Sequence, residues 1–221
     1  MTRIKICGIR DKVQALAAVE AGADFIGLVL APSHRQVSPA QAREIASAVK
    51  KSSDAAKVVG VFVNAPVFQI NEIADFCALD VVQLSGNESW EYCRKIANPV
   101  IKAIRIGRQS PEEVCAELSA ASKLLTGRRF ITLLDSQVED KYGGTGESFD
   151  WNLAQKVAKS FPVIIAGGLD PKNVARLIER VSPWGVDVSS GVETDGVKDI
   201  AKIRAFVEAV RKADEKKQAA T

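Results

Sequence analysis

The stretch PVIIAGGLDPKNVARLIERVSPWGVDVSSG, residues 162–191, contains a strand, a helix and a second strand in succession. Two short apolar runs, residues 162–166 and 184–189, have the length and composition of buried strands. Between them, Asp170-Pro171 has the residue types that begin a helix. Strands joined through a helix run parallel, so this stretch predicts a parallel α/β fold.

The same alternation extends over the whole chain. Ser38-Pro39 and Ser110-Pro111 each combine a capping serine with proline at the first helical position, and so predict two further helix starts. The other strands are expected at residues 3–7, 23–30, 57–63, 80–84, 99–105 and 130–135, and the helices at 11–21, 38–51, 66–77, 88–97, from 110, at 149–160, from 170 and at 198–213. Eight such units fit a single-domain (β/α)8 barrel with a parallel eight-stranded sheet over residues 1–213. Residues 214–221 are expected to form a charged, frayed tail, and a doubly wound open sheet is the alternative fold.

Composition excludes several classes of function. Thirty Lys and Arg against 27 Asp and Glu leave a net charge of +3, and aromatic residues make up only 6%, which argues against nucleic-acid binding. No apolar run is long enough for a membrane span and no signal peptide is visible, so a cytoplasmic protein is expected. Four cysteines without a C-x-x-C pair, and a single histidine, predict reduced thiols and no metal site.

Small residues follow the last two expected strands. In (β/α)8 barrels the active site lies at the carboxyl ends of the strands, and the loops after strands 7 and 8 commonly bind phosphate. Glycines there allow close backbone approach to an anion. We therefore expect a phosphate site; the alternative is that these are ordinary tight turns. The residues concerned are Gly167, Gly168, Ser189, Ser190 and Gly191.

Two reactive side chains end strands on either side of the expected barrel mouth. Cys7 ends the first strand and Asp135 ends the sixth, and a thiol facing a carboxyl suits a general base and a general acid. Taken alone, Cys7 could be core filler and Asp135 a structural cap. The glycine-rich segment 141–151 lacks the spacing of a nucleotide-binding loop and is expected to be a mobile flap beside the site.

The motifs together resemble one enzyme family. KICGI at 5–9, VGVFVN at 59–64, GGTGESFDW at 143–151, IAGGL at 165–169 and GVDVSSGVE at 185–193 are similar to those of phosphoribosylanthranilate isomerases, in order and over nearly the whole chain. The resemblance implies an Amadori rearrangement of N-(5-phosphoribosyl)anthranilate in tryptophan biosynthesis, without cofactor or metal. It also implies a small phosphosugar as the binding partner and a monomer or homodimer.

The resemblance also implies residue roles. Asp135 would protonate the ribose ring oxygen, Cys7 as thiolate would remove the C2 proton, and Arg35 would pair with the anthranilate carboxylate. The alternative for Arg35 is an exposed loop arginine. Further substrate contacts are implied for Gly144, Gly167, Gly168, Asp187, Ser189, Ser190 and Gly191.

The sequence departs from the family pattern at the fourth strand. Ser85 stands where the family usually has histidine, which affects the expected substrate contacts rather than the proton transfers. His34 is expected to be a loop residue, because Cys7 and Asp135 already fill both proton-transfer roles. Two other functions stay open on the residues alone: another phosphosugar isomerase or epimerase on the same barrel, and a non-catalytic barrel that binds a phosphorylated ligand.

Overall fold

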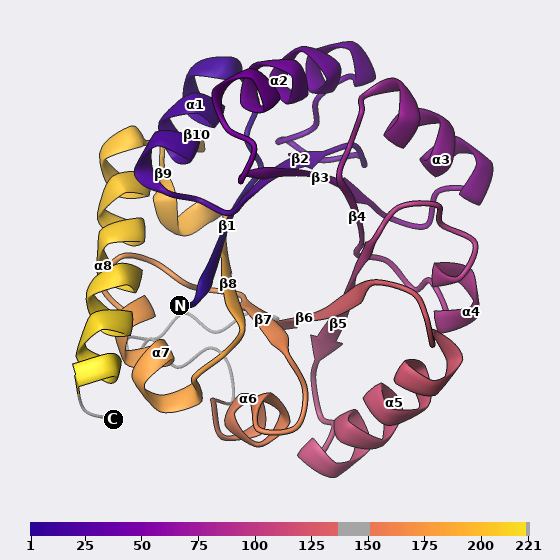
Figure 1. Cartoon of the computed structure of the whole chain (residues 1–221), viewed down its shortest axis with the longest axis vertical. Helices are drawn as coiled ribbons and strands as arrows, with labels where there is room; N and C mark the ends of the chain where they lie inside the picture. Colours follow the sequence, from indigo (N-terminus) through magenta and orange to yellow (C-terminus); the bar gives the residue numbers. More distant parts are fainter. Residues whose placement is uncertain (137–150, 220–221) are drawn as a thin grey trace.

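Eight parallel strands close into a barrel in the computed structural model, which describes residues 1–136 and 151–219 (Figure 1). The strands pair in chain order, and β1 also pairs with β8, with Lys5 level with Asp187. This closure confirms the (β/α)8 barrel and excludes the open sheet. The strands are β1 (Arg3–Cys7), β2 (Phe25–Val29), β3 (Lys57–Phe62), β4 (Val81–Leu84), β5 (Val100–Ile106), β6 (Phe130–Ser136), β7 (Val163–Ala166) and β8 (Gly185–Val188).

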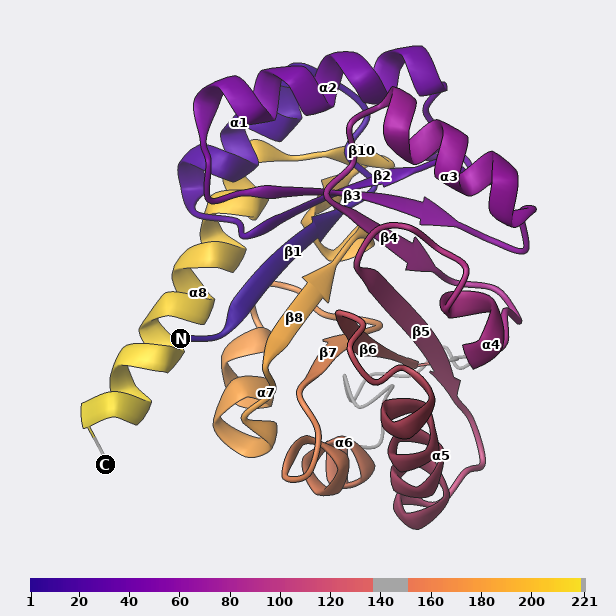
Figure 2. The same cartoon turned by 45° about the vertical axis from the view of Figure 1, so that its right-hand side comes forward.

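Helices surround the strands on the outside of the barrel (Figure 2). The Ser38 and Ser110 hydroxyls accept hydrogen bonds from the backbone N–H groups of Gln41 and Glu113, whose side chains accept in return from the serine N–H groups. Both predicted helix starts are thereby confirmed as capping boxes. The helices are α1 (Lys12–Ala21), α2 (Pro39–Ser52), α3 (Val67–Phe76), α4 (Trp90–Cys93), α5 (Pro111–Leu124), α6 (Trp151–Ala158), α7 (Val174–Val181) and α8 (Ile200–Ala219).

The helices α4 and α7 start later than the sequence predicts, each for a local reason. A helix expected over 88–97 is only the short α4, because Glu88 turns inward to the preceding loop and Ser89 caps the helix instead. The helix expected from Asp170 begins at Val174. The Asp170 carboxylate accepts hydrogen bonds from the backbone N–H groups of Lys172 and Asn173 and holds a turn there.

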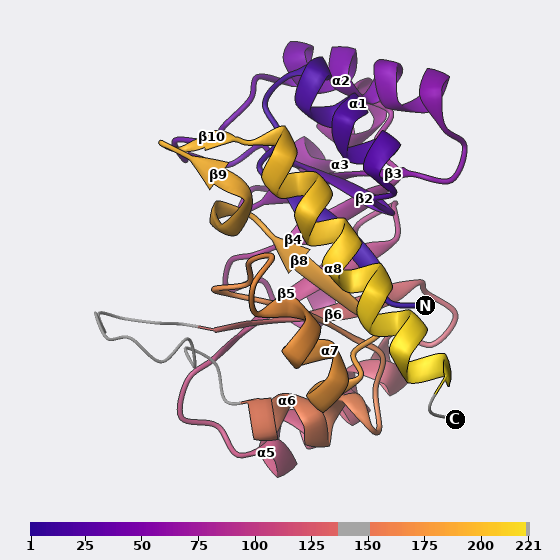
Figure 3. The same ribbon diagram turned by 90° about the vertical axis from the view of Figure 1, so that its left-hand side faces the viewer.

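The last helix is longer than predicted. Instead of ending at residue 213 and fraying from 214, α8 continues to Ala219. Asp214 is buried because its carboxylate accepts hydrogen bonds from both the backbone N–H and the hydroxyl of Thr2, at 2.7 and 2.6 Å. Figure 3 shows α8 beside β1, with both chain ends on the same side of the molecule. No helix among the described residues is long and apolar enough to cross a membrane.

The barrel strands separate an outer core, beneath the helices, from an inner core inside the barrel. Alternate side chains point outward and pack under the helices, as Ile4, Ile6, Val186 and Val188 do on β1 and β8. The intervening side chains point into the barrel, where an apolar cluster includes Val59, Ile101, Ala103, Leu133, Ile164 and Ala166. By the same alternation Lys5, Cys7, Asp135 and Asp187 point inward. Charged and reactive groups therefore occupy the carboxyl end of a largely apolar barrel interior.

Candidate active site

Cys7 and Lys5 lie on the inner face of β1 and come from the same apolar strand. Both are buried: 9% of Cys7 and 1% of Lys5 is exposed. The ammonium of Lys5 donates to Asp187 Oδ1 on the adjacent strand β8, at 3.0 Å. The sequence analysis did not assign a role to Lys5. A charged residue between two isoleucines of a buried strand is the pattern that could have indicated one.

Gly27 on β2 leaves room for the thiol and the ammonium together. A Cβ atom at this position would lie 3.0 Å from Cys7 Sγ and 3.1 Å from Lys5 Nζ. Both functional atoms therefore border the same small volume beside the Gly27 backbone. Any larger residue at position 27 would displace the Cys7 thiol or the Lys5 ammonium.

Burial and charge act against each other on the Cys7 thiol. Burial raises the pKa of Cys7 above its ordinary value, and the nearby positive charge of Lys5 counteracts part of this rise. Asp187 raises the pKa of Cys7 further, whereas Lys198 lowers it. Although burial by itself would lower the pKa of Lys5, the carboxylate of Asp187 and the thiol raise it, so Lys5 is a cation.

Asp135 lies at the carboxyl end of β6, level with Arg105 on β5 and Ala166 on β7. Burial and the negative charge of Asp187 raise the pKa of this half-buried carboxyl to about 6, and Arg105 and Lys5 act in the opposite direction. A carboxyl with this pKa keeps an appreciable protonated fraction near neutral pH, as a general acid needs.

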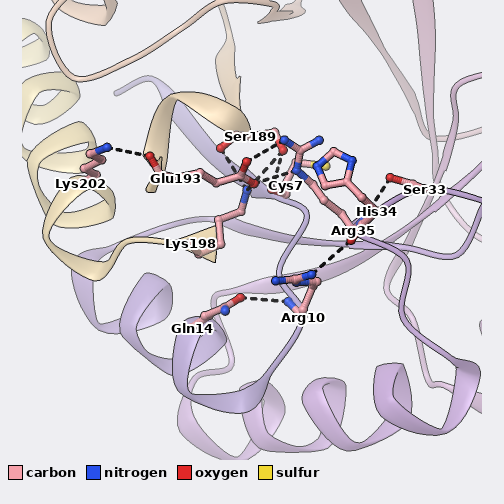
Figure 4. A network of polar contacts seen from close by, with 10 residues as sticks. All are labelled: Cys7, Arg10, Gln14, Ser33, His34, Arg35, Ser189, Glu193, Lys198 and Lys202. Carbon is pink, nitrogen blue, oxygen red and sulfur yellow. Dashed lines mark hydrogen bonds and ion pairs between the residues drawn. The ribbon is translucent and has the colours of Figure 1, made fainter. Parts of the chain in front are cut away.

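Arg35 is held over the mouth by Glu193 (Figure 4). Arg35 Nε and Nη2 donate to the two oxygens of the Glu193 carboxylate, both at 2.7 Å. Lys198 also donates to this carboxylate, and Lys202 donates to the Glu193 carbonyl. Hydrogen bonds from Arg35 and Lys198 lower the pKa of Glu193 to about 2. Sequence analysis missed Glu193 as a partner of Arg35, because the two are far apart in the chain.

A short antiparallel hairpin positions Glu193. It consists of β9 (Glu193–Thr194) and β10 (Val197–Lys198), follows the 3-10 turn η1 (Ser190–Val192), and lies away from the N-terminus (Figure 3). Gly8, with φ at +79°, lies directly under Arg35: a Cβ there would be 2.5 Å from Arg35 Cδ. Glycine at this position therefore allows the arginine side chain to cross the end of β1.

The loops after β7 and β8 meet, as the phosphate-site prediction requires. A Cβ at Gly191 would lie 1.9 Å from the Leu169 carbonyl oxygen, so the two loops touch at a residue without a side chain. Gly167 and Gly168 both have positive φ, at +93° and +65°, which favours glycine. The backbones of all three glycines, and the exposed Ser190, are thus available at the mouth.

Several residues named from the sequence lie elsewhere or are already engaged. The hydroxyl of Ser189 donates to the Cys7 carbonyl oxygen at 3.1 Å, so it ties β8 to β1. Ser85 is half-buried and accepts from Gln83 Nε2, and His34 is exposed in the loop before Arg35. Gly144 lies outside the described residues.

One cavity among the described residues lies away from the site. An apolar cavity of about 300 Å³ lies at the opposite end of the barrel, lined by residues such as Phe25, Ile131 and Trp184 near the amino ends of the strands. Lys5, Asp135 and Glu193, whose pKa values are strongly shifted, lie instead on the side of the carboxyl ends of the strands. The chemistry thus indicates the carboxyl-end mouth, in keeping with the general location of active sites in this fold.

The fold and the site define a (β/α)8-barrel protein with a thiol, a carboxyl and a pair of glycine-rich loops at one mouth. Residues 4–209 match the family described as N-(5'phosphoribosyl)anthranilate (PRA) isomerase, and the chain belongs to this family. An N-(5'-phosphoribosyl)anthranilate isomerase of Dehalococcoides mccartyi is 46% identical over 215 residues, which is 97% of this chain and 98% of the relative.

Solved structures agree with the sequence comparison. The phosphoribosyl anthranilate isomerase of Thermotoga maritima has a TM-score of 0.81 and 39% identity, covering 96% of this chain and all of that one. A second phosphoribosyl anthranilate isomerase structure, with a TM-score of 0.78 and 37% identity over 96% of this chain and 100% of that one, is a complex with reduced 1-(o-carboxyphenylamino)-1-deoxyribulose 5-phosphate.

Proposed function

We propose that this chain catalyses the Amadori rearrangement of N-(5-phosphoribosyl)anthranilate to 1-(2-carboxyphenylamino)-1-deoxyribulose 5-phosphate in tryptophan biosynthesis. Membership of the family over residues 4–209 is the observation that carries the proposal. It is supported by Cys7 and Asp135, which both point into the barrel at its carboxyl end. A relative bound to a reduced form of the product adds support.

The proposed mechanism assigns one proton transfer to each group. Protonated Asp135 gives its proton to the ribose ring oxygen while the C1–O bond breaks and the anilino nitrogen supplies electrons, which yields a Schiff base. The Cys7 thiolate then takes the C2 proton, and the electron pair moves to form an enolamine. Tautomerisation returns a proton to C1 and gives the ketone. Since each step is a proton transfer or a C–O cleavage, the mechanism needs no cofactor.

The raised pKa values of Cys7 and Asp135 determine how often the ligand-free protein carries the reactive combination of thiolate and protonated carboxyl. This combination is a minor one. The thiol pKa of Cys7 is raised above its ordinary value and that of Asp135 is about 6. Most molecules at neutral pH therefore carry a thiol and a carboxylate, and the reactive thiolate with a protonated carboxyl is less populated. Its population is constant between the two pKa values and falls outside them, so we expect a bell-shaped profile of kcat/KM whose acid limb lies near pH 6.

Substrate anchoring is proposed at two places. Arg35 uses Nε and Nη2 for Glu193, and among the described residues Nη1 makes no hydrogen bond, so this end of the guanidinium could receive the anthranilate carboxylate. The backbones of Gly167, Gly168 and Gly191, with Ser190, would hold the phosphate.

The cysteines support a reducing compartment such as the cytoplasm. All four are free, and Cys77 and Cys93 are buried with no partner cysteine. Free thiols of this kind persist where glutathione keeps thiols reduced.

The test is to follow the fluorescence of N-(5-phosphoribosyl)anthranilate after mixing with the purified protein. The wild type should consume it, and Cys7→Ser and Asp135→Asn should each slow the reaction by about 10²–10⁴-fold. Cys115→Ser, at a half-buried thiol on α5, is the matched control and should react like the wild type. No consumption by the folded wild type would contradict the proposed activity, and full activity of either site variant would contradict its role.

A further inference from the structure

We infer that the buried Lys5–Asp187 ion pair is a positioning element of the active site, which biases Cys7 toward its charged form and Asp135 toward its neutral form. The inference deepens the proposed function and rests on the acid and base roles proposed above. Nothing in the motifs or the comparisons assigns a role to Lys5, and Asp187 was expected only among the substrate contacts.

The ion pair has no evident structural purpose at its location. It lies inside a barrel whose remaining described interior is largely apolar, with Lys5 1% and Asp187 8% exposed. A buried ion pair is seldom more stabilising than apolar residues of the same volume, because both charges lose their hydration. Apolar side chains such as Ile101 and Leu133 fill inward positions on β5 and β6.

The geometry places the cation beside the base. Lys5 precedes Cys7 by two residues on the same inward face of β1, and the Gly27 contacts put Lys5 Nζ and Cys7 Sγ on the border of one small volume. Asp187 fixes the ammonium there at 3.0 Å from across the β1–β8 pairing. An ammonium at this place stabilises a thiolate, and the hydrogen bond to Asp187 Oδ1 holds the ammonium in position.

The carboxylate of the ion pair, Asp187, acts on the proposed general acid, Asp135. Asp187 on β8 is separated from Asp135 on β6 by a single strand, whose inward residue there is the small Ala166. The negative charge of Asp187 disfavours a second carboxylate nearby and so increases the protonated fraction of Asp135. One ion pair therefore acts in opposite senses on the two groups, as a reaction that needs a charged base and a neutral acid requires.

Other charged groups among the described residues also face Cys7 and Asp135. Cys7 is also influenced by Lys198 from β10 and by Arg35 from the loop after β2. Both of these cations are bound to the Glu193 carboxylate, which offsets their charge. Asp135 also faces Arg105 of β5. Lys5 is the buried cation whose fixed position adjoins the thiol, so its removal should have the clearest effect.

The test measures the pH dependence of Cys7 alkylation by iodoacetamide, resolved by peptide mass spectrometry so that each thiol is counted separately. In Lys5→Met the midpoint should move to higher pH, by roughly 1–3 pH units. In Asp187→Asn it should move to lower pH, because an amide oxygen can still accept from the Lys5 ammonium while the negative charge that opposes the thiolate is gone. The alkylation midpoint of the double variant K5M/D187N should lie between those of Lys5→Met and the wild type. Because the double variant buries no unpaired charge, it provides the test if Lys5→Met fails to fold.

The matched control is Lys102→Met. Lys102 is also buried, at 6% exposure, and its ammonium pairs with Glu88 at 3.2 Å, but it points outward from β5. Its loss removes a comparable buried ion pair and should leave the Cys7 midpoint unchanged. Shifts of the same sign in Lys5→Met and Asp187→Asn, or an unchanged midpoint in Lys5→Met, would overturn the inference.

Activity provides an independent second measurement. In Asp187→Asn the acid limb of the kcat/KM profile, expected near pH 6, should move to lower pH as the pKa of Asp135 falls. A limb that stays in place would overturn the part of the inference that concerns Asp135. Because alkylation needs no turnover, opposite midpoint shifts in an inactive protein would refute the proposed reaction but leave the role of the ion pair at Cys7 intact.

Discussion

At the scale of single residues, the site depends on glycines as much as on reactive side chains. Gly27 leaves space for the Cys7 thiol and the Lys5 ammonium, and Gly8 leaves space for Arg35. Gly191 allows the loops after β7 and β8 to touch. At each of these positions a methyl group would meet a functional side chain or a backbone carbonyl.

The Gly191→Ala variant should bind phosphorylated ligands poorly. Its Cβ would lie 1.9 Å from the Leu169 carbonyl oxygen, so the two loops must separate. We expect a KM for the substrate raised by tenfold or more, together with weaker binding of inorganic phosphate in calorimetry. Gly107→Ala is the control, because its Cβ meets only the end of a flexible side chain at 3.6 Å. Equal phosphate affinity in both variants would remove Gly191 from the proposed phosphate site.

At the scale of elements, the β9–β10 hairpin links the mouth to the start of α8. Glu193 on β9 receives Arg35 from the loop after β2 and Lys198 from β10, and Lys202 of α8 donates to its carbonyl oxygen. Arg35, 158 residues away in the sequence, thus meets Lys198 at one carboxylate. The hairpin therefore orders the loop that carries Arg35 before any substrate binds.

Stability should depend on pH through Glu193. Its pKa is lowered to about 2 in the folded protein, below the unfolded value near 4.5, so its charge stabilises the fold above about pH 4.5. This stabilisation should be lost progressively as the pH falls from about 4.5 to 2. Denaturant unfolding of Glu193→Gln should show a shallower decline over that window than the wild type. Glu208→Gln, at an exposed helical pair, should decline like the wild type.

At the scale of the whole molecule, contacts between the chain ends complete the barrel closure. The β1–β8 pairing joins the first and last strands, and Asp214 of α8 binds both the backbone and the hydroxyl of Thr2. Arg211 adds a hydrogen bond to the Thr2 carbonyl oxygen at 2.7 Å. The residues expected to fray from position 214 therefore hold the first strand in place.

Asp214→Ala should destabilise the barrel without altering the chemistry. Losing two buried hydrogen bonds should lower the free energy of unfolding by about 2–4 kcal/mol. Thermal unfolding should then occur several degrees lower, since about 1 kcal/mol corresponds to roughly 2–4 °C for a chain of this size. The kcat at low temperature should be unchanged. Glu208→Ala, on the same helix but exposed, should leave the melting temperature almost unchanged.

Local patterns in the sequence were sufficient to predict the barrel and the residues at the carboxyl ends of its strands. Apolar runs, Ser-Pro caps and glycine pairs are local features, and they predicted the strand order and two serine-capped helix starts. They also indicated the glycine-containing loops after β7 and β8, which the structure brings into contact. Because parallel strands all end at one face of a barrel, Cys7 and Asp135 could be assigned to one mouth from the sequence alone.

The tertiary structure decided which polar and charged groups meet. Lys5 with Asp187, Arg35 with Glu193 and Thr2 with Asp214 are each separated by more than 150 residues, and no local pattern specifies such pairs. Their partners depend on the register of the barrel closure and on where a hairpin folds back over the mouth. The sequence thus determined the fold and the reactive groups, whereas the closed barrel determined the electrostatic environment of those groups.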